Sequence, residues 1–311
     1  MKFFTKRLPA MMVVLSVAAV VLTSCGNVSN TNSAVDAKMV VEQSVAAMEK
    51  MMAQSTPVSQ ANVTGPRYSV LPNWKVDYEQ IRTDLIGSSA MTMYMAEYLA
   101  ENDILKEGKT YTDVVEEANL KFVFLMENTN EGVQIKMNQY TGDTMETDIL
   151  LDFHYDYNAM QPTKSIFAQF DENSVLVTLF NYKTNEAVEF WLVVDSEMNE
   201  TFKKNMEEKN MSFDKFSEYG ISGYTIAKGD FKAQNIEAYK YSDEITEQSS
   251  DKLETPVEEE TVTELFNAVY AQVKDYCKSP EVMDTKNAEA RVFYKDMFMY
   301  AYPKANELAG V

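Results

Sequence analysis

The stretch METDILLDFHYDYN, residues 145–158, decides the fold because it shows which side chains face a core. Its odd-numbered residues are mostly apolar, whereas its even-numbered residues are polar or charged with the exception of Leu150. Side chains alternate between the two faces of a β-strand. The stretch therefore predicts a strand that has one face on a core and the other face in water.

A hairpin with the preceding stretch VQIKMNQ, residues 133–139, fixes an expected register. The apolar residues of both strands must share one face, and a connection of three residues at 141–143 meets that requirement. Ile135 then lies opposite Ile149, and Lys136 lies opposite Asp148. In this register His154 extends beyond the end of the preceding strand.

The same alternation continues through residues 120–195 in six segments: KFVFLME, VQIKMNQ, METDILLDFHYDYN, SIFAQF, SVLVTLFNY and AVEFWLVVD. Short polar turns join most of them, which predicts antiparallel hairpins because parallel strands need longer connections. We expect an α+β fold in which an antiparallel sheet of about six strands forms a meander between amino-terminal and carboxy-terminal helices.

The rest of the chain is divided by the spacing of its apolar residues and by its composition. We expect a single α+β domain over residues 36–311. Its predicted parts are a helical region (36–119), the sheet (120–195), a mixed helical region (196–241), an acidic linker (242–260) and carboxy-terminal helices (261–303).

Asp152, His154 and Asp156 are the first candidates for a functional site, and His154 is the only histidine in the chain. Residues two apart on a strand point the same way, so these side chains could converge on a cation. Carboxylates would have to supply the other ligands, which suits calcium or manganese better than zinc. The alternatives are an acid/base site and a solvated polar face that binds no cofactor.

A second group of candidates is aromatic and lies on neighbouring predicted strands. These residues are Tyr155, Tyr157, Tyr182 and Trp191. They either pack in a core beneath the flanking helices or contact an apolar or carbohydrate ligand on a concave sheet.

The amino terminus has the layout of a secretory signal. Lys2, Lys6 and Arg7 precede an uncharged apolar run that is too short to span a bilayer as a stable helix. The following Leu22-Thr23-Ser24-Cys25 resembles a bacterial lipobox. The resemblance implies that residues 1–24 are a lipoprotein signal peptide and that Cys25 is acylated.

Residues 25–35 then predict a flexible tether, because they are small and uncharged. Several acyl chains would anchor the protein stably to a membrane. Gly26 follows the cysteine, so the resemblance implies the outer membrane in a diderm bacterium. In a monoderm it implies the outer face of the plasma membrane.

The chain is strongly acidic, with a net charge of −20. Loss of residues 1–24 would remove three basic residues and no acidic ones, which takes the charge to −23. Phosphates repel such a surface, so we expect no nucleic-acid partner. Cys277 would be the only thiol left, and its place on the apolar side of a predicted helix indicates a buried hydrophobic residue.

The sequence contains no P-loop, G-x-S-x-G elbow or H-E-x-x-H motif, and His154 would have to serve any histidine mechanism. We therefore expect a protein that is not an enzyme. It would bind an envelope protein or a small ligand outside the cytoplasm. The alternatives are an anchored hydrolase that uses a carboxylate pair, and a carrier of lipids or small molecules.

Overall fold

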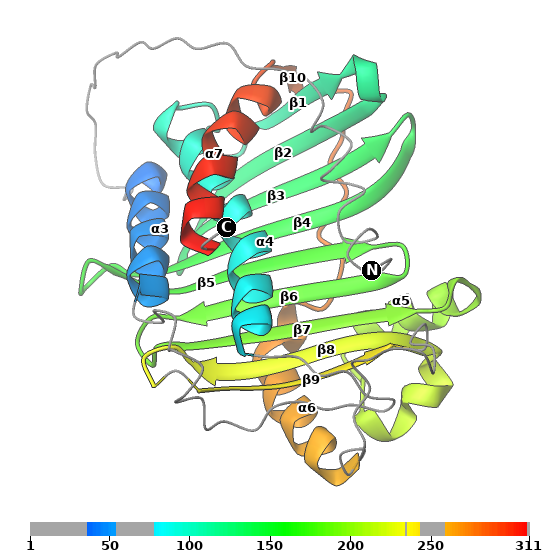
Figure 1. Cartoon of the computed structure of the whole chain (residues 1–311). Coiled ribbons are helices and arrows are strands. Elements are labelled where there is room, and N and C mark those ends of the chain that lie inside the picture. Colours follow the sequence, from blue (N-terminus) through cyan, green and yellow to red (C-terminus); the bar gives the residue numbers. More distant parts are fainter. Residues whose placement is uncertain (1–35, 54–77, 234, 243–258, 310–311) are drawn as a thin grey trace.

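The computed structural model describes residues 36–53, 78–233, 235–242 and 259–309 (Figure 1). In these residues ten strands form one sheet in the order β10-β1-β2-β3-β4-β5-β6-β7-β8-β9. The strands are β1 (Thr110–Val115), β2 (Leu120–Thr129), β3 (Gly132–Thr141), β4 (Thr144–Asp156), β5 (Gln161–Asp171), β6 (Ser174–Asn181), β7 (Glu186–Val194), β8 (Ile221–Asp230), β9 (Asn235–Ser242) and β10 (Glu289–Ala290).

The described residues also form five α-helices and four short 3₁₀ segments. The helices are α3 (Ala37–Ala53), α4 (Tyr78–Glu101), α5 (Asn199–Glu208), α6 (Glu259–Val273) and α7 (Tyr294–Ala309). The 3₁₀ segments are η2 (Glu116–Ala118), η3 (Ser196–Met198), η4 (Phe213–Tyr219) and η5 (Lys274–Tyr276). No helix among them is both long enough and apolar enough to cross a bilayer.

The predicted α+β fold is confirmed, and so are the six predicted strands, which are β2 to β7. The expected size of the sheet was wrong, because β1 lies in the region predicted to be helical and β8 and β9 lie in the region predicted to be mixed helical. The sheet is also not purely antiparallel. Tyr111 and Thr112 of β1 pair in parallel with Glu289 and Ala290 of β10.

In the β3–β4 hairpin the apolar residues of both strands share one face, as predicted, but the strands pair in a different register. Ile135 lies opposite Leu151 instead of Ile149, and Lys136 lies opposite Leu150 instead of Asp148. Gly142 and Asp143 alone form the turn, and a β-bulge places an extra residue in β4 after Met145. A two-residue turn would put the two apolar sets on opposite faces, and the bulge restores the match.

One face of the sheet, which we call the helix face, is covered by α3, α4 and α7 (Figure 1). Ile149, Leu151, Phe153 and Tyr155 of β4 point into this core, and Phe153 is completely buried there. The core also includes the amphipathic face of α3. Its buried apolar residues are Val40, Val41, Val45, Met48, Met51 and Met52.

The opposite face, which we call the second face, has two parts. Across β5 to β8 it packs against α5, α6 and η4 in a second apolar core that contains Phe190, Phe202 and Phe266. Both carboxy-terminal helices therefore dock on the rest of the fold, since α6 packs here and α7 packs on α4.

Across β1 to β4 the second face is crossed by Lys278–Val292, which we call the crossing segment. It contacts Asp148 of β4 through Ser279, and Asn138 of β3 through Met283. It then pairs with β1, where the amide of Arg291 donates to the carbonyl of Thr112 at 2.9 Å. The chain thus passes around the β1 edge to reach the helix face.

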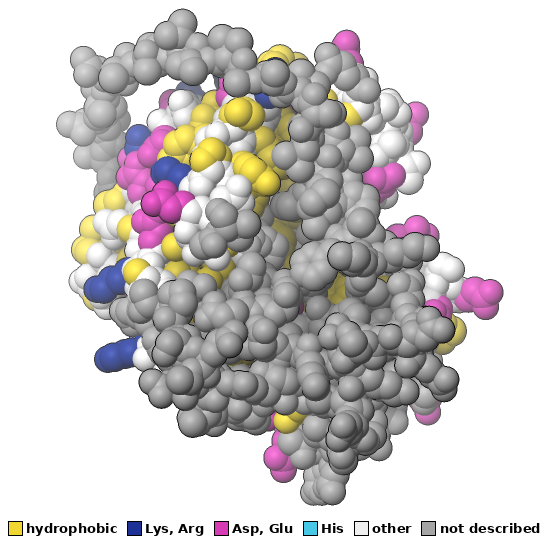
Figure 2. Space-filling model, in the orientation of Figure 1, with side chains coloured by type: hydrophobic (Ala, Val, Ile, Leu, Met, Phe, Trp, Pro, Cys, Tyr) yellow, Lys and Arg dark blue, Asp and Glu magenta, His cyan; other side chains and the backbone are white. Residues whose placement is uncertain are grey.

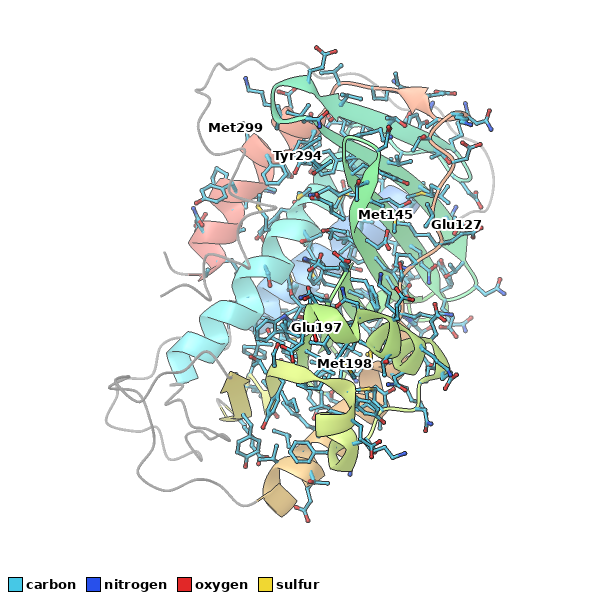
Figure 3. All side chains as sticks on the ribbon, turned by 90° about the vertical axis from the view of Figure 1, so that its right-hand side faces the viewer. Glu127, Met145, Glu197, Met198, Tyr294 and Met299 are labelled. Atoms are coloured by element: carbon cyan, nitrogen blue, oxygen red, sulfur yellow. The ribbon has the colours of Figure 1, made fainter. Side chains whose placement is uncertain are left out.

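At the end of this path α7 begins against β1 and β2. The amide of Tyr294 donates to the buried carboxylate of Asp113 at 2.6 Å, and the Tyr294 ring stacks on Phe122 with centroids 3.9 Å apart. Figure 3 shows Tyr294 on the side of α7 that faces the strands and Met299 on its outer side. Burial raises the pKa of Asp113, although backbone amides oppose that shift.

Polar contacts then hold α7 on α4. The ammonium of Lys304 donates to Glu97 Oε2 at 2.9 Å and to the hydroxyl oxygen of Tyr300 at 2.8 Å. Figure 2 shows acidic and basic side chains next to one another on the face that α3 and α7 cover. Burial and the neighbouring carboxylates raise the pKa of Tyr300, so its phenol is neutral at pH 7.

Three predicted segments lie outside the described residues, wholly or in large part. They are the signal peptide of residues 1–24, the tether of residues 25–35 with Cys25, and most of the acidic linker of residues 242–260.

The hairpin between β2 and β3 depends on Gly132, whose φ is +151°. A Cβ atom there would lie 1.7 Å from the carbonyl oxygen of Phe153. We predict that Gly132→Ala lowers the free energy of unfolding by about 2 to 4 kcal/mol, through strain and collision together. Gly108→Ala is the control, because Gly108 also has a positive φ but nothing lies within 4 Å of the added atom. Equal losses in urea denaturation would contradict this account.

Candidate functional site

Asp148 and Asp152 of β4 lie on the second face and are buried, in contrast to the expected solvated surface. Asp148 is 2% exposed and Asp152 is 4% exposed. The crossing segment and η5 cover this part of β4, a contact between residues more than a hundred positions apart. Burial of a carboxylate is costly unless hydrogen bonds satisfy its oxygens, so the partners of each one matter.

His154 lies between two carboxylates and a tyrosine. Its Nε2 is 3.1 Å from Asp152 Oδ2 and 3.0 Å from the Tyr276 hydroxyl, and its Nδ1 is 3.2 Å from Glu131 Oε2. The imidazole is 17% exposed, whereas the Glu131 side chain is 75% exposed. Only a doubly protonated ring could donate to both carboxylates at once.

Tyr276 connects this cluster to the carboxy-terminal part of the chain. Burial, followed by the negative charges of Asp152 and Glu131, raises the pKa of the Tyr276 phenol. The phenol is therefore neutral at pH 7, and it also hydrogen-bonds to Asp152. Asp152, His154 and Tyr276 thus form a connected set that joins η5 to β4.

Asp156 does not join this cluster. Its Oδ1 accepts the amides of Asn158 and Ala159, both at 3.0 Å, and so closes the turn between β4 and β5. These amides lower the pKa of Asp156, with Ala159 the larger cause. The structure brings together Asp152 and His154 of the predicted site but leaves Asp156 in a separate role.

In the described part of the chain, no cluster of metal ligands supports a cation at this strand. Among the described residues, no group of three or more His, Cys, Asp or Glu side chains is arranged to hold a metal ion. Binding of calcium or manganese by Asp152 and His154 stays a prediction.

Asp148 is the second buried carboxylate of β4. Its Oδ1 accepts from Asn138 Nδ2 at 2.6 Å, and its Oδ2 accepts from the hydroxyl of Ser279. Asn138 in turn accepts the amide of Met283 at 2.8 Å. Burial raises the pKa of Asp148, and the hydrogen bonds from Ser279 and Asn138 counteract only part of that shift.

Two of the four candidate aromatic residues hold α3 on the helix face. The hydroxyl of Tyr155 donates to Gln43 Oε1 at 2.8 Å. The hydroxyl of Tyr182 donates to the carbonyl of Ser44 at 3.0 Å and lies 2.6 Å from Ser165 Oγ.

The other two lie in the same layer. Tyr157 packs beside Tyr155 with ring centroids 5.3 Å apart, and Trp191 is buried on β7 between Leu176 and Thr225. The arrangement is that of a core beneath helices, and contact of these rings with a ligand stays a prediction.

Cys277 is buried in the second apolar core, which confirms the expected hydrophobic role. Burial is the main cause that raises the pKa of its thiol, so the thiol is neutral at pH 7.

The structure also contains an open cavity of about 280 Å³ away from these candidates. It lies where α3 begins, beside the end of α4 and β2. Its lining residues are Asp36, Ala37, Lys38, Ala100, Asp103, Leu105, Lys106, Glu107, Met126 and Asn128. None of the residues predicted as a site contributes to this lining.

Sequence reasoning missed Glu131, Tyr276 and Ser279. Glu131 lies in a turn, and Tyr276 and Ser279 belong to a distant part of the sequence, so no local spacing connects them to β4. Comparison of the chain with family models, curated proteins and solved structures found no match.

The geometry predicts different effects for substitutions of His154 and Asp156. His154→Ala leaves Asp152 with a missing partner and should lower the free energy of unfolding by about 1 to 3 kcal/mol at pH 7. His154→Gln keeps a hydrogen-bond donor, so its free energy of unfolding should fall by less. Asp156→Asn keeps the turn acceptor and should change the value by less than about 0.5 kcal/mol. Urea denaturation tests this, and equal effects of the His154→Ala and Asp156→Asn substitutions would contradict it.

Proposed function

We propose that this chain is a lipid-anchored binding or interaction protein outside the cytoplasm of a bacterium. The observation that carries the proposal is the amino-terminal sequence, in which basic residues, a short apolar run and Leu22-Thr23-Ser24-Cys25 occur in the order of a lipoprotein signal. The acidic composition supports a covalent anchor, because anionic headgroups would repel the protein.

The described structure is consistent with attachment through the amino terminus. The first described helix is α3, and its buried side chains form part of the core of the helix face. Tyr155 and Tyr182 fix the middle of the helix by hydrogen bonds to Gln43 and Ser44. A tether that ends at α3 would therefore hold the sheet through a packed helix.

A binding role is favoured over catalysis by how the reactive side chains are used. Both ring nitrogens of His154 face partners within the protein, and the thiol of Cys277 is buried. Two of the aromatic residues that would line a carrier pocket, Tyr155 and Tyr182, instead hold α3 on the sheet. These contacts support a scaffold that presents a surface to an envelope protein or a small ligand.

The anchor is tested by a pair of cysteine variants. We predict that the full-length wild type, expressed in a bacterium, partitions into the Triton X-114 detergent phase, and that mass spectrometry finds acyl chains on an amino-terminal Cys25. Cys25→Ser should move the protein to the aqueous phase. Cys277→Ser, the matched control, should leave partitioning unchanged. An unmodified mature terminus at another residue would contradict the lipid anchor.

A turnover assay separates the binding role from the hydrolase. The wild type and the Asp148→Asn and Asp152→Asn variants are incubated with glycan, peptide and ester libraries. The proposal expects no product that depends on either aspartate. Turnover that disappears with one of these substitutions, while the variant remains folded, would overturn it.

A further inference from the structure

The crossing segment differs from the rest of the described fold in how it is held. It runs over the second face from η5 to α7 with only the two residues of β10 in regular pairing. Met283 is its one buried side chain, in a small cluster with Val123 and Tyr140. Irregular segments of this length within a compact domain are uncommon, and they often act as covers.

Polar contacts to β3 and β4 provide the main attachment near its beginning. The amide of Met283 donates to Asn138, and Asn138 donates to Asp148. The hydroxyl of Ser279 lies against both Asp148 Oδ2 and the carbonyl of Pro280, the latter at 3.3 Å. Asn138 and Ser279 both donate to the carboxylate of Asp148, which is almost completely buried.

We propose that the crossing segment opens as a local unit, and that the binding of one proton by Asp148 favours its closed state. The segment is then a pH-sensitive cover over β2 to β4. When it opens, Val123 and Tyr140 lose Met283 as their neighbour, and Asp148 gains access to water.

The hydrogen bonds around Ser279 allow both protonation states of Asp148 when the cover is closed. An ionised Asp148 accepts the hydroxyl hydrogen of Ser279. A protonated Asp148 donates to Ser279 Oγ, whose hydroxyl then donates to the carbonyl of Pro280. The two protonation states of Asp148 therefore differ in free energy mainly by the cost of keeping the ionised carboxylate away from water.

The direction of the pH effect follows from burial. Burial is the largest cause that raises the pKa of Asp148 in the closed state, and opening returns the carboxylate to solvent. The proton on Asp148 therefore stabilises the closed state to its full extent below the ordinary pKa of aspartate. It is lost as pH rises through the raised value.

The charged and titratable neighbours of Asp148 come from several elements. Asp171 on β5 acts in the same direction as burial, and Lys203 from α5 acts against it. Tyr140 on β3 faces Asp148 as well, and Asp148 contributes to the raised pKa of its phenol. Tyr140 therefore stays neutral through neutral pH. Burial also raises the pKa of Asp171, but its carboxylate bonds to Thr147, Gln169 and Ser174 and not to the crossing segment. Asp148 is therefore the carboxylate whose contacts change when the cover opens.

Hydrogen exchange at the amide of Met283 tests the cover in the full chain. Protection factors are measured from about pH 4, the ordinary pKa of an aspartate, up to about pH 8 and are corrected for the intrinsic exchange rate at each pH. We predict that protection of Met283 falls as pH rises, by at most about tenfold per pH unit because one proton is linked. The amide of Tyr155 on β4, which donates to the carbonyl of Glu131 in the β2–β3 turn, should be better protected at every pH.

Three variants make the result decisive. Asp148→Asn keeps the shape but cannot ionise, so Met283 protection should lose its pH dependence. Glu281→Gln removes an exposed carboxylate from the same segment and should keep the wild-type dependence. Ser279→Ala should reduce protection at all pH values. Equal protection of Met283 and Tyr155, no pH dependence in the wild type, or the same dependence in Asp148→Asn would each overturn the proposal.

Discussion

The fold depends on a contact between the polar residues of β4 and a segment that follows them by more than a hundred residues. Asp148 and Asp152 lie on the second face, where neither carboxylate is open to water. Ser279 hydrogen-bonds to Asp148, and His154, held by Tyr276, contacts Asp152. Without these partners the sheet would contain two buried charges with unfilled acceptor sites, at a cost of about 1 to 3 kcal/mol or more for each.

This contact also determines how the carboxy-terminal part is arranged around the sheet. The residues just after α6 are fixed at β4, and Asp113 of β1 fixes the start of α7. Between these points the chain must cross β3 and β2 and pass the β1 edge. The two apolar cores are consequently connected by one segment that is mostly polar, and α7 reaches the helix face, where it covers Phe122 and packs on α4.

Much of this could be predicted from alternation alone. The apolar residues of β4, such as Phe153, face the core, and the strands β2 to β7 occur where the period of two predicted them. The faces were right even though the register was wrong, because a bulge compensates for the short turn. Alternation reports which residues share a face, but it does not report what covers that face.

The missed features share a physical cause. Gly223 and Gly229 interrupt the apolar pattern of β8, and β10 has two residues that form a strand only through pairing with β1. Similarly, Glu131, Tyr276 and Ser279 carry no local pattern that marks them as partners of β4. Polar residues in a strand were therefore interpreted as solvated, although tertiary contacts bury them.

A double-mutant cycle between Asp148 and Ser279 tests most directly whether the crossing segment stabilises the fold through its hydrogen bond to the buried carboxylate of β4. The free energy of unfolding is measured for the wild type, Asp148→Ala, Ser279→Ala and the double variant at one pH. The structure predicts a favourable coupling energy of about 1 to 2 kcal/mol, so the double variant loses less than the sum of the single ones. Additive losses would show that the two side chains do not interact, and would contradict the account.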